Sequence, residues 1–154
     1  MEKSLILVKP DGLQRGLVGE IISRFERKGL KIIGLKMLNI EDSLLEEHYS
    51  HLLDKPFFAD IKDFMKSSPI VAIALEGGEG SVVAVRTLVG PTKGHEAPAG
   101  TIRGDFGLSG SNNMVHASDS VENGQKEVDR FFGGSELFEY TKTDFEHIYG
   151  REAK

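Results

Sequence analysis

The stretch Ile70-Val71-Ala72-Ile73-Ala74-Leu75 is apolar at every position. Because the run is also short, it predicts a strand that is covered on both faces. A second apolar run, Ser4-Leu5-Ile6-Leu7-Val8, stops at Lys9-Pro10-Asp11-Gly12, which has the composition of a turn. We expect both runs to be buried strands, and the other elements are assigned outward from them along the chain.

Five segments are predicted helices because their apolar residues share one face. Val18–Phe25 has this spacing, and Gly29 is a suitable C-cap for it. Ser81–Val89 is rich in valine and also suits a strand, but Gly90-Pro91 after it favours a helix. The other three are Ser43–Leu52, which begins with a capping box of Ser43 and Glu46, Pro56–Met65, and Val121–Phe132.

The order of the predicted elements defines the fold class. Leu30–Leu38, with Gly34 at either a bulge or a close packing point, and Met114–Ala117 complete the set of strands. Strands and helices then follow one another as β-α-β-(α-α)-β-α-loop-β-α. This order predicts an α+β, ferredoxin-like split βαβ sandwich, in which helices pack on one face of a four-stranded antiparallel sheet. At 154 residues the chain fits a single domain over residues 1–154.

Two segments lack a regular period. Gly90–Ser111 is rich in glycine and long for a loop of a compact domain, so we expect it to have a function. Ser135–Lys154 carries aromatic residues among polar ones. We expect this tail to wrap either the domain or a neighbouring subunit.

The composition excludes several classes of protein. The chain has no cysteine, which rules out disulfides and thiolate chemistry, and no apolar run approaches the length of a membrane span. Its formal net charge of −5 provides no broad basic field for nucleic acid. The first apolar run is too short for a signal-peptide core, so the expected location is the cytoplasm, without a membrane partner. An anionic small substrate remains compatible with the sequence, because a pocket is governed by its local charges.

The chemistry is expected to centre on Asn113-Met114-Val115-His116-Ala117-Ser118-Asp119-Ser120. His116 lies here between a short strand and a helix start, for which Asp119 and Glu122 supply a capping box. Rigid backbone on both sides can hold an imidazole facing a cleft, where it would act as a nucleophile. A hydrogen-bonded structural histidine fits this octapeptide equally well, so the rest of the chain has to decide.

Cationic and polar residues flank the long loop and end the first strand. Arginine offers a planar fork for phosphate oxygens and lysine a compact charge, so the set suits polyphosphate recognition. Each basic residue alone would more often be a solvated surface charge. The sequence has no G-x-x-x-x-G-K-[ST] motif, so a P-loop mechanism is not available. The residues concerned are Lys9, Arg86, Thr92, Lys93, Arg103 and Asn113.

Three stretches resemble the signature sequences of the nucleoside diphosphate kinases. They are Val8-Lys9-Pro10-Asp11-Gly12, Gly100-Thr101-Ile102-Arg103-Gly104-Asp105-Phe106 and the octapeptide around His116. Glu47-His48-Tyr49, followed by Lys55-Pro56-Phe57-Phe58, is similar to the same family. The likeness runs in order from Ser4 to about Tyr149, which is nearly the whole chain.

The resemblance implies a nucleoside diphosphate kinase that transfers the γ-phosphate of a nucleoside triphosphate, typically ATP, to a nucleoside diphosphate by ping-pong kinetics. It implies that His116 carries the phosphoryl group, with Lys9 and Tyr49 beside it and with Ser118 and Glu127 supporting its ring. A Mg²⁺ ion would arrive on the nucleotide phosphates, with no protein side chain as a direct ligand. Phe57 would stack on the base. The nucleotide-binding residues would be Lys9, Phe57, Arg86, Thr92, Arg103 and Asn113.

The resemblance also implies partners. These would be nucleoside di- and triphosphates and further copies of the chain, in a hexamer rather than a tetramer, with no requirement for nucleic acid. Four positions depart from the family pattern. Ala117 replaces a usual glycine, Leu75 an aromatic residue, Gly94 a loop proline, and Gly110 an apolar residue opposite the stacking Phe57.

Two other functions fit parts of the sequence. A binding or regulatory member of the family would keep the fold without turnover. Loss of His116 or of an arginine would indicate such a member, but these residues are all present. A nucleic-acid-binding ferredoxin-like module would expose aromatic residues on its central strands beside a basic surface. The predicted strands are aliphatic and the chain is acidic, which disfavours this second alternative.

Overall fold

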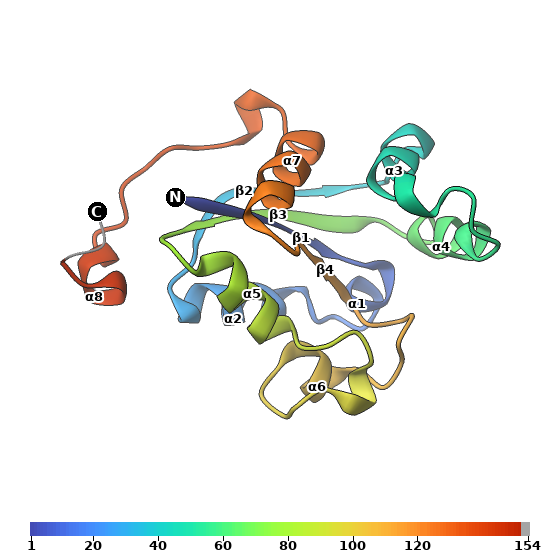
Figure 1. The fold of residues 1–154 in the computed structure, drawn as a ribbon, viewed down its shortest axis with the longest axis horizontal. Helices are drawn as coiled ribbons and strands as arrows, with labels where there is room; N and C mark the ends of the chain where they lie inside the picture. Colours follow the sequence, from blue (N-terminus) through green and yellow to red (C-terminus); the bar gives the residue numbers. More distant parts are fainter. Residues whose placement is uncertain (152–154) are drawn as a thin grey trace.

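The computed structural model describes residues 1–151 (Figure 1). Residues 152–154, the end of the predicted domain and of its tail, lie outside the described residues. The strands are β1 (Glu2–Val8), β2 (Lys31–Leu38), β3 (Ile70–Gly77) and β4 (Val115–Ala117). The helices are α1 (Pro10–Gln14), α2 (Val18–Lys28), α3 (Asp42–His48), α4 (Phe58–Met65), α5 (Ser81–Val89), α6 (Ile102–Phe106), α7 (Val121–Phe131) and α8 (Phe145–Tyr149), with 3₁₀ turns η1 (Ser50–Leu52), η2 (Gly94–Glu96) and η3 (Gly134–Glu136). None of these helices is both long enough and apolar enough to cross a membrane.

The sheet confirms the predicted fold class. In the described part of the chain its order is β2-β3-β1-β4, and every neighbouring pair is antiparallel. The two apolar runs are the central strands, where Ile6 of β1 lies opposite Ile73 of β3. On the other edge of β1, Leu7 lies opposite His116 of β4. The bulge expected as one role of Gly34 in β2 is confirmed, because the register shifts next to this residue.

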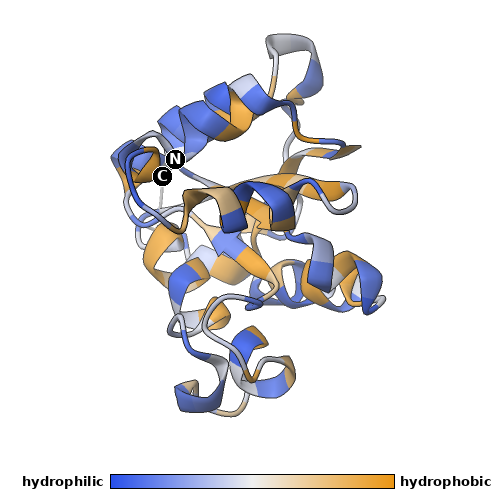
Figure 2. Cartoon of the chain, turned by 90° about the vertical axis from the view of Figure 1, so that its right-hand side faces the viewer, coloured by the Kyte–Doolittle hydropathy of each residue, from blue (hydrophilic) through white to orange (hydrophobic). Residues whose placement is uncertain are grey.

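Helices cover both faces of the sheet, so the expectation of helices on one face is wrong. Side chains of β1 alternate between two cores. Ile6 and Val8 belong to the core with α2 and α5, whereas Leu5 and Leu7 belong to the core with α3 and α7. Figure 1 shows α2 and α5 below the sheet and α3 and α7 above it. Figure 2 shows the strands mainly in the hydrophobic colour, which explains why both of their faces require cover.

Three short helices were not predicted from the sequence, namely α1, α6 and, in the tail, α8. The expected turn at Lys9–Gly12 is the start of α1, where Pro10 occupies the first turn. Within the expected loop Gly90–Ser111, α6 is capped by Thr101, whose side chain accepts a hydrogen bond from the backbone N–H of Gly104. Helices of five residues are too short to display an amphipathic period, so periodicity did not reveal them.

Both predicted capping boxes are wrong. Helix α3 begins after Glu41 without a side-chain cap, and Ser43 lies inside its first turn. Helix α7 is capped by Ser120, whose Oγ accepts a hydrogen bond from the backbone N–H of Asn123. Asp119 instead accepts a hydrogen bond from Nδ2 of Asn123. Several neighbouring polar residues could cap the start of a helix, and sequence spacing alone did not identify the residue that does so.

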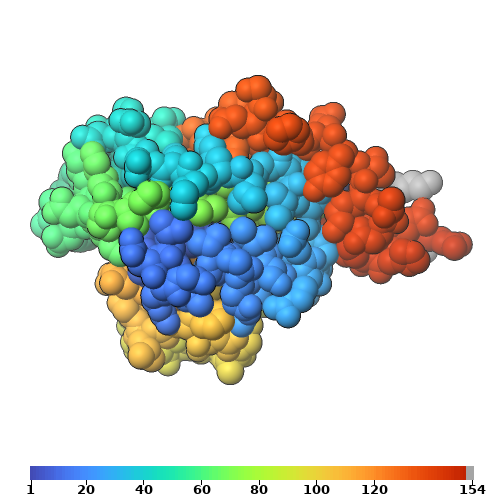
Figure 3. Space-filling model, turned by 180° about the vertical axis from the view of Figure 1, so that it is seen from behind, coloured from blue at the N-terminus to red at the C-terminus, as the bar shows by residue number. Residues whose placement is uncertain are grey.

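The tail packs against the sheet of its own chain. The backbone N–H of Phe138 donates a hydrogen bond to the carbonyl of Ile33, and the Tyr140 hydroxyl donates one to the carbonyl of Ile32. Figure 3 shows the tail in red over one end of the molecule and the long loop in yellow and orange projecting below. Of the two expected destinations for the tail, the described residues therefore reach the domain itself.

Candidate active site

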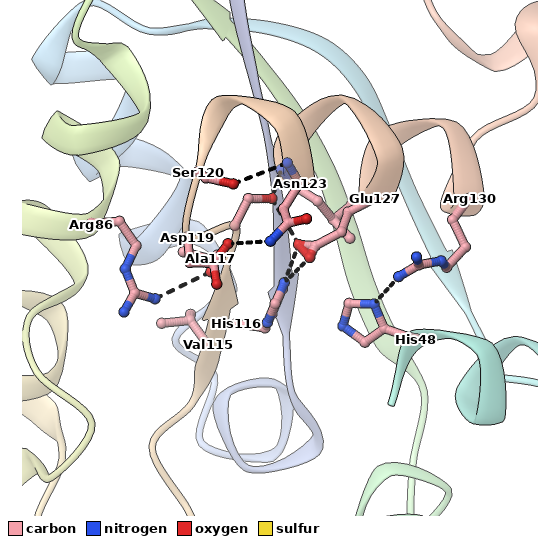
Figure 4. Close-up of polar contacts among 12 residues, drawn as sticks. His48, Arg86, Val115, His116, Ala117, Asp119, Ser120, Asn123, Glu127 and Arg130 are labelled. Carbon is pink, nitrogen blue, oxygen red and sulfur yellow. Dashed lines mark hydrogen bonds and ion pairs between the residues drawn. The ribbon is translucent and has the colours of Figure 1, made fainter. Parts of the chain in front are cut away.

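His116 lies on β4 and faces the side of α7 (Figure 4). Its Nε2 is 2.7 Å from Oε1 of Glu127. Since a carboxylate accepts hydrogen bonds and does not donate them, Nε2 has to be the donor. In the neutral ring the lone pair is then on Nδ1. The hydrogen bond to Glu127 therefore leaves Nδ1 as the ring nitrogen with a free lone pair.

Glu127 is itself held in place from the central strand. The Oγ of Ser118 donates a hydrogen bond of 2.8 Å to Oε1 of Glu127 and accepts one of 2.9 Å from the backbone N–H of Leu5. Ser118 is completely buried. The structure brings both predicted supporting residues to His116 and connects them to β1.

The backbone before His116 is unusual. Met114 has a φ of 69°, and the N–H of Val115 donates a hydrogen bond to the carbonyl of Asn113, so the chain makes a tight three-residue turn. Residues with side chains rarely adopt this conformation, and surrounding contacts have to hold it. Here the N–H of Met114 donates to Oδ2 of Asp11, and its carbonyl accepts from the N–H of Lys9. The sequence reading assigned no role to Asp11, although it lies in a quoted motif.

Two cavities adjoin at Tyr49, close to His116. The first, of about 420 Å³, contains His116, Glu127 and Arg86. The second has a volume of about 570 Å³ and extends towards α4. Cavities of this size suit a small-molecule ligand such as a nucleotide. Among the residues that line the second cavity are Lys9, Tyr49, Phe57, Thr92, Gly110 and Asn113.

Lys9 is a buried cation at the end of β1. Its Nζ donates a hydrogen bond of 2.9 Å to Oδ1 of Asn113. Burial and the nearby Arg103 lower the pKa of Lys9 to about 8, against a smaller opposing effect of Asp11. A phosphate group placed beside this ammonium would stabilise its charged form.

Asn113 connects the two ends of the long loop. Its Nδ2 donates hydrogen bonds of 3.1 Å to the carbonyls of Thr92 and Gly110. Together with the hydrogen bond from Lys9, these contacts engage both the oxygen and the nitrogen of the Asn113 side-chain amide in hydrogen bonds within the protein. The structure thus places Asn113 and Thr92 in the expected cavity and gives Asn113 a clear part in shaping it.

The two predicted arginines have different surroundings. Arg86, on α5, lines the first cavity and donates a single hydrogen bond, of 3.2 Å, to the carbonyl of Ala117. Arg103, on α6, is only 5% exposed. Its guanidinium donates to the carbonyls of Asn113, Gly90 and Val115. Arg103 therefore ties the long loop to β4, and fewer of its N–H groups remain for a ligand.

Tyr49 and Phe57 form the aromatic part of the site. Burial raises the pKa of Tyr49 to about 12, so its hydroxyl stays protonated and can donate. Phe57 precedes α4 and is 47% exposed at the second cavity. A Cβ added at Gly110 would come no closer than 3.4 Å to Lys93. The wall at Gly110 thus has room for a side chain that this sequence does not supply.

The side chains near the cavities indicate whether the protein itself offers ligands for the expected Mg²⁺ ion. Within residues 1–151, the group of side chains suited to hold a metal is His48, His116 and Glu127, whose ligand atoms lie within 4.8 Å of one another. Two imidazoles suit a transition metal, whereas Mg²⁺ prefers oxygen ligands. Glu127 and Asp119, which border the first cavity, are already hydrogen-bonded to other side chains. This donor set fits a Mg²⁺ ion held by nucleotide phosphates.

The fold and the site define a class of protein. It is a ferredoxin-like α+β protein with a hydrogen-bonded histidine and an arginine in one cavity and a buried lysine in the adjoining cavity. The family model described as nucleoside diphosphate kinase matches residues 2–137, and the chain belongs to this family.

Individual relatives agree over nearly the full length. The nucleoside diphosphate kinase of Archaeoglobus fulgidus is 50% identical over 97% of this chain and 98% of its own length. That of Staphylothermus marinus is 53% identical over 90% of this chain and 98% of its own. The solved structure of a family member from Babesia bovis has a TM-score of 0.93 at 44% identity, covering 97% of this chain and all of that one. A Halobacterium salinarum nucleoside diphosphate kinase in complex with CDP has a TM-score of 0.91 at 39% identity, covering 96% of this chain and 98% of that one.

The protein is thus a phosphotransferase that binds nucleotides. It transfers the γ-phosphate of a nucleoside triphosphate to a nucleoside diphosphate in two half-reactions, through a phosphohistidine. Enzymes of this family need a divalent cation.

Proposed function

We propose that His116 is the residue that becomes phosphorylated, with Nδ1 as the attacking atom. The observation that carries this proposal is the 2.7 Å hydrogen bond between Nε2 of His116 and Glu127. The lone pair of Nδ1 forms the new bond to the γ-phosphorus while the bond to the bridging oxygen breaks, and the nucleoside diphosphate leaves with that electron pair. The Nε2 proton stays on the ring, where Glu127 stabilises the developing positive charge. The second nucleotide reverses these steps.

Cationic side chains are proposed to stabilise the transferring group. Phosphoryl transfer needs in-line placement and neutralisation of charge on the oxygens more than covalent assistance. Arg86 in the first cavity and Lys9 in the second lie on either side of Tyr49, which supports their contact with the phosphates. A bound Mg²⁺ ion would supply further positive charge to the phosphate oxygens. Arg103 contributes through the loop that it holds and through its remaining donors.

The base is proposed to stack on Phe57 at the mouth of the second cavity. Stacking is tolerant of base identity because every base has a π face. The open wall at Gly110 leaves the other face of the base without a side chain, which supports low selectivity and moderate affinity.

Labelling with γ-phosphate-labelled ATP and Mg²⁺, without an acceptor, tests the nucleophile. We expect a labelled protein that keeps its label in alkali, loses it in acid and passes it to added GDP. His116→Ala should retain the fold and show no label. Labelled GTP formed without labelled protein would contradict the proposal, as would substantial turnover in His116→Ala.

We further propose that the protein is a hexamer. A hexamer built from dimers needs two kinds of contact surface. Leu35 and Met37 are exposed on the edge strand β2, and Val83 and Val121 are exposed where α5 and α7 begin. Two separate apolar surfaces support this assembly, and sedimentation equilibrium would test it. The single domain over residues 1–154 and the cytoplasmic location remain predictions from the sequence.

A further inference from the structure

His48 and Arg130 form a contact beside the nucleophile that the reaction described above does not use. His48 is 6% exposed and packs on His116, with ring centroids 4.6 Å apart and ring planes at 83°. Tyr49 and Phe131 enclose the same ring at centroid distances of 4.8 and 5.1 Å. The His48 ring is therefore confined between three rings, and one of them is the nucleophile.

Arg130 determines which nitrogen of His48 carries the proton. Nη1 of Arg130 lies 3.1 Å from Nδ1 of His48. A guanidinium only donates hydrogen bonds, so Nδ1 has to accept, and the proton of the neutral ring has to be on Nε2. Figure 4 shows the His48 ring with one edge turned to Arg130 and the other towards His116.

The surroundings also keep His48 uncharged. Burial lowers the pKa of His48 to about 2, and His116 and Arg130 contribute further. The other groups that lower it are His51 and Lys9, so all of these neighbours oppose a positive charge on the ring. A ring that is neutral and has one tautomer presents the same edge to His116 at all times.

We propose that Arg130 and His48 are positioning residues for the nucleophile. Arg130 holds His48 in the Nε2–H tautomer, and this ring packs on His116 so that Nε2 of His116 stays directed at Glu127. Rotation of the His116 ring would move Nδ1 out of line with the phosphorus, which is costly in a reaction that depends on orientation. The inference rests on the proposed role of His116.

The same geometry disfavours a metal ion between His48, His116 and Glu127. In His48, Nδ1 is bonded to Arg130 and Nε2 carries the proton, so neither lone pair is free for a metal. The cluster is better explained as a set of rings that fixes an orientation.

Nitrogen NMR on the free protein tests the tautomer independently of activity. Near neutral pH we expect Nδ1 of His48 to be unprotonated and Nε2 to be protonated. Arg130→Leu should produce a mixture of both tautomers. A protonated Nδ1 in the unmodified protein would overturn the proposal, whereas failure of the His116 assignment would leave this result unchanged.

The rate of phosphorylation by saturating ATP tests the consequence. Arg130→Leu should lower this rate roughly tenfold, with an unchanged Kd for ADP, because orientation and not binding is lost. Arg130→Lys, which keeps a donor, should recover part of the rate. The matched control is Arg27→Leu on α2, because the Arg27 side chain is 68% exposed and Arg27 is not among the residues that line the two cavities. A weaker Kd at an unchanged rate would mean that Arg130 binds phosphate, which would overturn the proposal.

A double-mutant cycle tests the coupling of the pair. His48→Phe keeps an aromatic ring against His116 but removes both nitrogens. In this background Arg130→Leu should cause no further loss of rate. Losses that multiply as independent effects would show that Arg130 acts by a route other than His48.

Discussion

Lys9 is the site cation whose charge responds to pH in the working range. Its pKa of about 8 means that it is cationic below this pH and loses its charge above it. The phosphates of ADP have their last pKa at about 6, so they stay fully charged in this window. We therefore predict that the Kd for ADP rises as pH increases beyond about 8, which calorimetric titration would measure. Lys9→Met should bind more weakly at every pH with a flatter profile, and a flat profile in the unmodified protein would contradict the assignment.

Glu127→Gln replaces a carboxylate, which can only accept hydrogen bonds from His116, with an uncharged amide that can also donate. The amide nitrogen of Gln can donate to Nε2, which would move the ring proton to Nδ1 and occupy the attacking lone pair. We predict a loss of phosphorylation rate of roughly 100-fold with little change in nucleotide affinity. Stopped-flow measurement with ATP would show it. Glu122→Gln, in the exposed first turn of the same helix, is the control and should retain the rate.

At the scale of single residues, the sequence predicted the groups with obvious chemistry. His116, Lys9 and Tyr49 belong to stretches with a family resemblance, and the structure gathers them around two adjoining cavities. The contact between His48 and Arg130 was missed because the residues are 82 positions apart and neither spacing nor composition connects them. The strained backbone at Met114 was also invisible, since it depends on acceptors and donors from the start of the chain.

Helix α7 owes its position to a glycine. A Cβ at Gly124 would lie 2.0 Å from the carbonyl oxygen of Lys3 on β1, so Gly124→Ala has to push the helix away from the sheet. Glu127 is one turn further along α7 and would move with it. We predict a loss of unfolding free energy of about 2 kcal/mol, measured by urea denaturation, and a lower phosphorylation rate. The control is Gly19→Ala on α2, where no atom lies within 4 Å, and it should stabilise the protein by about 0.5–1 kcal/mol.

Elements long enough to display a full period were predictable. Helix α2 matches the expected segment because its apolar residues share one buried face, and strand β3 matches because its apolar run is continuous. Helices α1 and α6 were missed because their ends are fixed by local contacts, such as the Thr101 cap, and by packing against distant segments. The continuous apolar run of β3 did predict cover on both faces of the sheet, whereas the expectation of helices on one face came from the order of the elements alone.

Assembly is a property of the whole molecule, and the edge strand β2 offers a way to alter it. Met37 is 61% exposed and Leu35 is 51% exposed, two positions apart, so both point to the same side of the strand. We predict that Met37→Lys shifts the protein to smaller species in sedimentation equilibrium. Circular dichroism should be unchanged, because the side chain contributes little to the core. An unaltered mass would mean that β2 is outside the subunit contacts.

The central place of β1 has a consequence for how the chain is made. This strand leaves the ribosome before either of its neighbours in the sheet, β3 and β4, has been synthesised. The bond between Leu5 and Ser118 joins residues 113 positions apart, and the helix that covers Leu5 and Leu7 begins only at Val121. A nascent chain thus carries an apolar strand whose edge towards β4 stays unpaired through most of its synthesis. Ribosome-bound chains that end before α7 should accordingly bind chaperones through their N-terminal segment and release them once α7 has emerged.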